Sequence, residues 1–235
     1  MIEDTEPRKG TSPWKFTDFV LLIVFSLVGA LAASIVLAGT GSDLLNPTVM
    51  DVAVTLVGQS VGALAYLRYM SNKRGTGSWD RDFGLRLVPF RIGALFLGIA
   101  LQIIIGLVLL FFVPEDTLQQ GISDVVSDAS GLGPRVLIAA MSVVVAPIVE
   151  ELIFRGVLLD WLNSVMDRTV AIWLSALLFG ASHLLDANIY ILPGLVVVGV
   201  ILATVALRDG DLGRAIPIHM GFNLLGVVAL FLGLG

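Results

Sequence analysis

Long apolar runs, separated by short polar segments, dominate the chain. They lie at about 19–38, 49–67, 92–113, 136–159, 170–184, 189–207 and 216–234. Most approach the roughly 20 residues that an α-helix needs to cross a bilayer, where the backbone must satisfy its own hydrogen bonds. Residues 101–112 show none of the period-two alternation of a transmembrane barrel. The pattern predicts an all-α polytopic membrane protein, a bundle of about seven transmembrane helices.

Composition agrees with this prediction and narrows the available chemistry. Hydrophobic residues make up 57% of the chain and charged residues only 14%, against about 25% charged in a typical soluble domain. The net charge of -5 leaves no basic face for phosphates, so we expect no nucleic-acid partner. Without cysteine, disulfides, thiolate metal sites and cysteine nucleophiles are excluded. Catalytic chemistry would depend on hydroxyl, imidazole and carboxyl groups.

Lys and Arg mark one side of the membrane. They precede the first run and lie between the second and third, fourth and fifth, and sixth and seventh runs, whereas segments 39–48 and 114–134 carry none. The positive-inside rule therefore predicts a cytoplasmic N-terminus. We expect residues 1–16 to form a loose, solvated cytoplasmic arm and residues 17–235 a single membrane-embedded domain. Segment 114–134 is expected to be a solvated loop, or an amphipathic segment on the outer surface.

Two adjacent carboxylates and a guanidinium interrupt the fourth apolar run. Ionisable groups at membrane depth are expensive and mark functional sites. On a helix, Glu151 and Arg155 share a face and suit an ion pair, whereas Glu150 points about 100° away from Glu151. Glu150 is therefore predicted to be a general base or acid. The alternative is a buried structural ion-pair network.

The chain has two histidines, and both lie in or beside apolar runs. His183 follows Phe179 by four residues and His219 precedes Asn223 by four, so each pair shares a helix face. Taken singly, each fits a structural role. Together with the glutamates they predict an intramembrane polar site with a base, an orienting imidazole and oxyanion donors, as activating a water against a carbonyl requires.

Straight helices would place the two histidines at different depths. His183 lies roughly 20 Å from the cytoplasmic end of its run, and His219 less than about 10 Å from the end of its own. These depths predict that the two histidines do not meet, unless the fifth helix starts outside the bilayer or helix tilt brings them together.

The polar residues form three motifs in order. They read E-E-x-x-x-R at 150–155, F-x-x-x-H at 179–183 and H-x-x-x-N at 219–223, all within a core at 136–235. In these motifs the chain resembles the CAAX prenyl endopeptidase and bacteriocin-processing (CPBP, Abi) family of intramembrane glutamic endopeptidases. The first three apolar runs match that family only in being hydrophobic.

The resemblance implies a role for each motif residue. Glu150 and His183 would activate the attacking water. His219 and Asn223 would stabilise the oxyanion formed at the scissile amide. The supporting residues would be Glu151, Arg155 and Phe179.

The predicted function is therefore that of a metal-independent endopeptidase in a prokaryotic cell membrane, hydrolysing a peptide bond of a membrane-associated protein or peptide. Two histidines and a glutamate could also bind zinc, but H-E-x-x-H and cysteine are missing, so we expect no cofactor. A proton-coupled transporter and a non-catalytic membrane scaffold of the same fold are the alternatives; no internal repeat favours the transporter. Prenylated C-termini, bacteriocin leaders and membrane-anchored regulators remain open as substrates, as does the oligomeric state.

Overall fold

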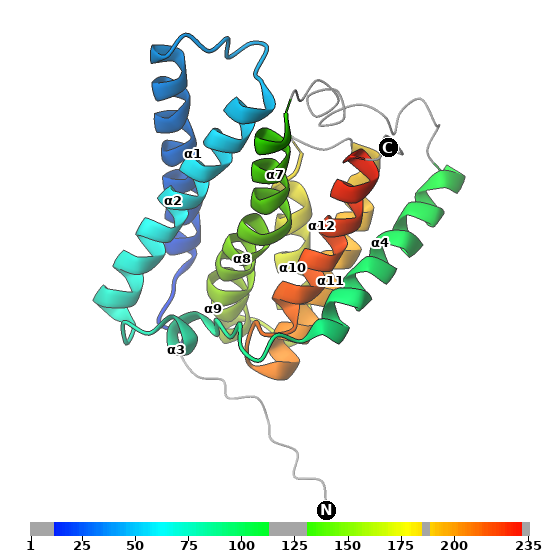
Figure 1. Ribbon diagram of the computed structural model, residues 1–235. Helices are drawn as coiled ribbons and strands as arrows, with labels where there is room; N and C mark the ends of the chain where they lie inside the picture. Colours follow the sequence, from blue (N-terminus) through cyan, green and yellow to red (C-terminus); the bar gives the residue numbers. More distant parts are fainter. Residues whose placement is uncertain (1–11, 113–130, 185–188, 232–235) are drawn as a thin grey trace, which may run out of the picture.

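The computed structural model describes residues 12–112, 131–184 and 189–231, and all regular structure in these ranges is helical (Figure 1). The all-α prediction is confirmed. The elements are α1 (Phe16–Gly39), α2 (Val49–Arg74), α3 (Trp79–Phe83), α4 (Ile92–Phe112), α7 (Leu132–Ala140), η1 (Met141–Val145), α8 (Ala146–Glu151), η2 (Leu152–Leu159), α9 (Asp160–Val165), α10 (Arg168–Ala181), η3 (Ile189–Ile191), α11 (Leu192–Asp209) and α12 (Ala215–Phe231).

The fourth apolar run is a continuous helical stretch, Leu132–Val165, that contains two π-helical segments, η1 and η2. π-Helical turns are rare and occur frequently at functional sites. Pro147 follows η1 and lacks the N–H that would bond to residue 143 in an α-helix, which favours the wider turn. Both glutamates of the first motif lie in α8, between the two π segments.

Five helical stretches are long and apolar enough to cross a membrane: Phe16–Gly39, Val49–Arg74, Ile92–Phe112, Leu132–Val165 and Ile189–Asp209. The other two predicted spans are shorter apolar helices, Arg168–Ala181 and Ala215–Val228. A helix of 14 residues such as α10 covers about 21 Å, less than the roughly 30 Å hydrocarbon core. These two short helices carry the second and third motifs.

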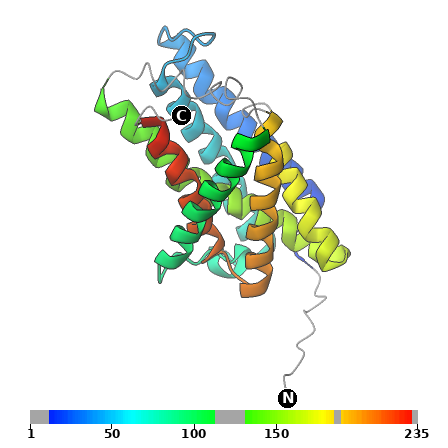
Figure 2. The same cartoon turned by 90° about the vertical axis from the view of Figure 1, so that its right-hand side faces the viewer.

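Glycines allow two pairs of helices to approach closely. A Cβ added to Gly29 of α1 would lie 2.1 Å from the carbonyl oxygen of Gly58 in α2, and one added to Gly98 of α4 would lie 1.9 Å from that of Ile218 in α12. Neither contact leaves room for a side chain. The turned view shows α4, in green, crossing α12, in red (Figure 2). The core centres on η2, all eight of whose residues are buried.

The segments rich in basic residues meet at one end of the bundle. The Leu212 N–H donates to the Gly84 carbonyl at 2.8 Å, and Asp209 pairs with Arg91 at 3.0 Å and with Arg214 at 2.5 Å. Figure 1 shows α3 and the α11–α12 turn at this end and the α1–α2 turn at the other. This arrangement agrees with the predicted alternation of loops; that the basic end is cytoplasmic stays a prediction.

The predicted N-terminal arm differs from the structure where it is described. Residues 1–11 lie outside the described residues, but Trp14 is only 1% exposed and stacks on Phe83 at 5.1 Å. Its indole N–H donates to the Asp82 carbonyl at 3.3 Å. The expectation of a solvated arm is therefore wrong for Trp14, because the indole buries its apolar surface, whereas Pro13 and Lys15 are exposed. Most of the predicted 114–134 loop falls at 113–130, outside the described residues.

Candidate active site

The predicted ion pair of the first motif is present in the structure. Arg155 Nη1 lies 2.9 Å from Glu151 Oε1, and both side chains are fully buried. Arg155 Nη2 also donates to the Gly199 carbonyl of α11 at 3.2 Å. A buried ion pair needs such additional hydrogen bonds to offset the loss of hydration. The pair therefore fixes η2 against α11.

His219 connects this pair to the first glutamate. Its Nδ1 lies 2.9 Å from Glu151 Oε1, and its Nε2 lies 3.6 Å from Glu150 Oε2. The Glu150 side chain is 28% exposed, whereas that of Glu151 is fully buried. The Glu150 side chain is thus partly exposed, although its Oε2, the oxygen that faces His219, is buried without a hydrogen-bond partner among the described residues.

The Phe179 ring is where the three motifs meet. The Arg155 guanidinium carbon lies 4.5 Å from the ring centre, and the ring centres of His183 and His219 lie 5.0 and 5.5 Å away. The expectation that the two histidines lie too far apart in depth to meet is therefore wrong. The residue counts themselves hold, since His183 lies 15 residues beyond Arg168 at the start of α10 and His219 is the fifth residue of α12. The two helices therefore differ in starting depth or tilt, which is the alternative that the sequence analysis left open.

His183 is bonded to its own helix. Its Nδ1 lies 2.9 Å from the Phe179 carbonyl oxygen, which also accepts the Ser182 hydroxyl at 2.7 Å. With Nδ1 donating to a carbonyl, Nε2 of the neutral ring is left as a proton acceptor. His183 joins the other motif residues through the Phe179 ring; among the described contacts, none bonds it directly to Glu150.

Asn223 is held by a residue that sequence reasoning missed. Its Nδ2 donates to the Ser142 carbonyl of η1 at 2.9 Å, which ties α12 to the helix that carries Glu150. The second N–H of the amide can serve a ligand. Ser142 contributes only its backbone carbonyl to this contact, so its side chain gave the sequence analysis no reason to identify it.

Gln102 of α4 is a second polar residue that the sequence analysis did not single out. Its Oε1 is buried without a hydrogen-bond partner among the described residues, and its Nε2 lies 3.9 Å from where a Cβ of Gly226 would be. An amide within a 21-residue apolar helix is a signal that the sequence carried.

The described residues contain no group of three or more His, Cys, Asp or Glu side chains that could hold a metal ion. Among the possible ligands, Glu151 and the Nδ1 of His219 already bond to each other, and Glu151 also bonds to Arg155. The absence of a metal requirement stays a prediction.

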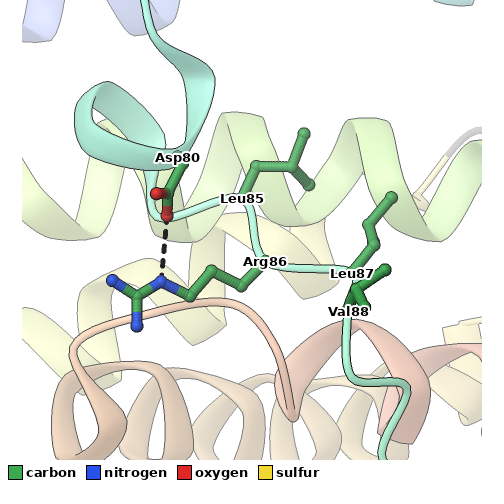
Figure 3. A pocket seen from close by; sticks show the side chains of 5 residues that line it. All are labelled: Asp80, Leu85, Arg86, Leu87 and Val88. Atoms are coloured by element: carbon green, nitrogen blue, oxygen red, sulfur yellow. Dashed lines mark hydrogen bonds and ion pairs between the residues drawn. The ribbon is translucent and has the colours of Figure 1, made fainter.

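A hollow of about 530 Å³ lies elsewhere (Figure 3). Its lining residues are Asp80, Leu85, Arg86, Leu87 and Val88. The Arg86 Nε donates to Asp80 Oδ1 at 2.9 Å across it. It shares no residue with the three motifs, so the candidate site is the buried polar cluster rather than this hollow.

Comparisons with known proteins place the resemblance on the same part of the chain. Residues 132–225 match the family described as type II CAAX prenyl endopeptidase, Rce1-like. An uncharacterized 24.3 kDa protein of Escherichia coli is 33% identical over 100 residues, which are 40% of this chain and 45% of that protein. The match thus spans less than half the length of this relative, and no solved structure matches the chain. Residues 132–225 are therefore similar to the Rce1-like CAAX prenyl endopeptidases, and the family resemblance carried by the three motifs is confirmed.

Proposed function

We propose that the protein is an intramembrane endopeptidase that hydrolyses a peptide bond of a membrane-associated protein or peptide. The observation that carries this proposal is the meeting of all three motifs around Phe179, with the partly exposed Glu150 side chain beside His219. The family match over residues 132–225 supports the same class of reaction.

In the proposed mechanism, Glu150 and His183 activate water. The carboxylate of Glu150 accepts a proton from the water, and the oxygen of that water attacks the scissile carbonyl carbon. The His183 Nε2, freed as an acceptor by the Nδ1 contact with Phe179, orients the water. This assignment of a base and an orienting group needs no metal.

The oxyanion would face α12. His219 and Asn223 lie one helical turn apart on this helix, and donors placed where negative charge develops lower the barrier most effectively in a dry site. The Ser142 contact holds the Asn223 amide in place. Glu151 and Arg155 would keep His219 in position.

The substrate would be anchored in the same membrane. The similarity to type II CAAX prenyl endopeptidases points to prenylated C-termini as one class; bacteriocin leaders and membrane-anchored regulators are others. We further propose that the N-terminus is cytoplasmic and that the host membrane is prokaryotic.

The test is cleavage of a quenched fluorescent peptide library, with and without prenyl groups, by the purified protein in detergent. The proposal predicts cleavage that survives a zinc chelator. Loss of cleavage with chelator would instead indicate a zinc enzyme. No cleavage across a broad library, together with proton flux in proteoliposomes, would favour a transporter; neither activity would favour a scaffold.

A further inference from the structure

One oxygen of Glu151 serves two donors. Arg155 Nη1 and His219 Nδ1 each lie 2.9 Å from Oε1, while Oε2 is buried without a partner among the described residues. An arginine guanidinium is only a donor. Oε1 therefore acts as an acceptor on the Arg155 side, and it keeps that role even if Oε2 carries a proton.

We propose that Glu151 is a positioning residue that holds a proton on Nδ1 of His219 and thereby leaves Nε2 as the proton-accepting nitrogen facing Glu150. Of the two neutral tautomers, only the one with a proton on Nδ1 makes a hydrogen bond to Oε1. The His219 side chain is 4% exposed and that of Glu151 is fully buried, so water has little access to offset the loss of this bond.

The contact with Glu151 favours one orientation of the imidazole ring. A flip would place a carbon next to Oε1, and among the described residues Arg155 would then be its only donor. The edge-to-face contact with Phe179, at 83°, fixes the plane of the ring. The tautomer is thus set by the contact of Nδ1 with Glu151, whereas Glu150 lies beside Nε2.

This tautomer changes the role that the resemblance implies for His219, an inference that rests on the proposed function. A neutral ring with its proton on Nδ1 cannot donate from Nε2 to an oxyanion. Nε2 must first receive a proton, and Glu150 Oε2, 3.6 Å away, is placed to supply it. His219 would therefore become an oxyanion donor only during the reaction.

The proton and electron balance of this step is complete. The water gives one proton to the Glu150 carboxylate, and Glu150 passes one proton to Nε2 and is a carboxylate again. The water oxygen bonds to the carbonyl carbon, and the π electrons of the carbonyl move to its oxygen. The products are an oxyanion and an imidazolium that face each other.

The tautomer can be measured directly, because the chain has only two histidines. The full-length protein in detergent is labelled with nitrogen-15 histidine, and His183→Gln assigns the remaining signals to His219. We expect a protonated-type Nδ1 and an unprotonated-type Nε2 for His219 at neutral to alkaline pH. A proton on Nε2 in the resting protein, with or without one on Nδ1, would overturn the proposal.

Two variants of Glu151 distinguish the effect of its hydrogen-bond acceptor from the effect of its negative charge. In Glu151→Gln the amide oxygen can occupy the Oε1 position and serve both donors, so the His219 signals should keep their pattern. Glu151→Leu removes the acceptor, and the preference for Nδ1 should be lost. Unchanged signals in the Leu variant, or a reversed tautomer in the Gln variant, would contradict the proposal; if the Leu variant does not fold, the wild-type and Gln spectra still decide. The spectra need no substrate, so failure of the hydrolysis assay is a separate result.

Discussion

Buried carboxylates occur in both halves of the molecule, but they differ in where they lie along their helices. In the N-terminal helices, Asp18 accepts the backbone N–H of Lys15 at 2.8 Å, and Asp51 accepts that of Thr48 at 2.9 Å. Each lies three residues after the residue that caps its own helix. Asp18 also pairs with Arg74, the last residue of α2. In the C-terminal half, Glu151 of α8 is bonded to His219 of α12 and to Arg155, which lies four residues further along the same helical stretch, in η2.

The difference shows which buried charges need a functional explanation. Asp18 and Asp51 satisfy backbone donors that every helix start leaves unpaired, as in a capping box. The Glu150–Glu151 pair caps no helix end, since helical structure continues on both sides of it. Buried charge that is remote from helix ends therefore distinguishes the candidate site better than buried charge alone.

The largest expected effect comes from removing the imidazole that orients the water in the proposed mechanism. His183→Ala should lower the rate of peptide hydrolysis by about 10²–10⁴, the typical contribution of groups that activate an attacking water. Ser182→Ala is the matched control, because its hydroxyl bonds to the same Phe179 carbonyl without a proposed catalytic role. Steady-state kinetics on a cleaved peptide measure both; similar rates for the two variants would remove His183 from the mechanism.

Next in size is the cost of leaving Arg155 without its partner. Glu151→Ala should lower the free energy of unfolding by about 3–5 kcal/mol, because it leaves a buried guanidinium without its carboxylate. Thermal unfolding in detergent measures the loss. The double variant Glu151→Ala with Arg155→Leu should recover part of it, and no recovery would show that the charge is not the cause.

The third prediction concerns the side-chain amide of Asn223 in α12. Asn223→Ala should lower turnover by about 10²–10³, as loss of an oxyanion donor does. Asn223→Asp keeps the size of the side chain but removes the N–H that bonds to the Ser142 carbonyl, so it should be at least as slow. Turnover close to wild type in both variants would show that Asn223 has no part in the reaction.

The smallest effect lies outside the membrane spans, in α3. Burial alone would raise the pKa of Asp82, but hydrogen bonds from Ser71, Thr76 and Gly77 outweigh it and hold that pKa below its ordinary value. A lowered carboxyl pKa contributes stability that is present above the ordinary value of about 4 and is lost as the pH falls through the folded-state value. Asp82→Asn should therefore lower the melting temperature at neutral pH and flatten its decline in acid; an unchanged acid decline would contradict this.

The sequence predicted the helices well because lipid permits few backbone solutions. Each apolar run corresponds to a helical stretch, as with 92–113 predicted and Ile92–Phe112 found. The largest difference in the described ends is at α2, which ends at Arg74, seven residues beyond the predicted end at 67. The pairing of Glu151 with Arg155 also followed from helical spacing alone.

What the sequence could not provide depends on contacts between helices. The sharing of Glu151 Oε1 by Arg155 and His219 requires knowing how α12 lies against α8. The depth of His183 relative to His219 was misjudged because the starting depth and tilt of α10 depend on how it packs against other helices, which brings both histidines to the Phe179 ring. Trp14 was counted with a polar arm, although an indole can bury its surface against a partner such as Phe83, 69 residues away.

The most direct test measures turnover and stability together in one variant from each half of the molecule. Glu150→Gln should lose peptide hydrolysis by about 10²–10⁴ with a nearly unchanged melting temperature. Asp51→Asn, which weakens a helix cap, should lose about 1 kcal/mol of stability and keep the turnover of its folded fraction. Wild-type turnover in Glu150→Gln would contradict a glutamate-based active site in the C-terminal half.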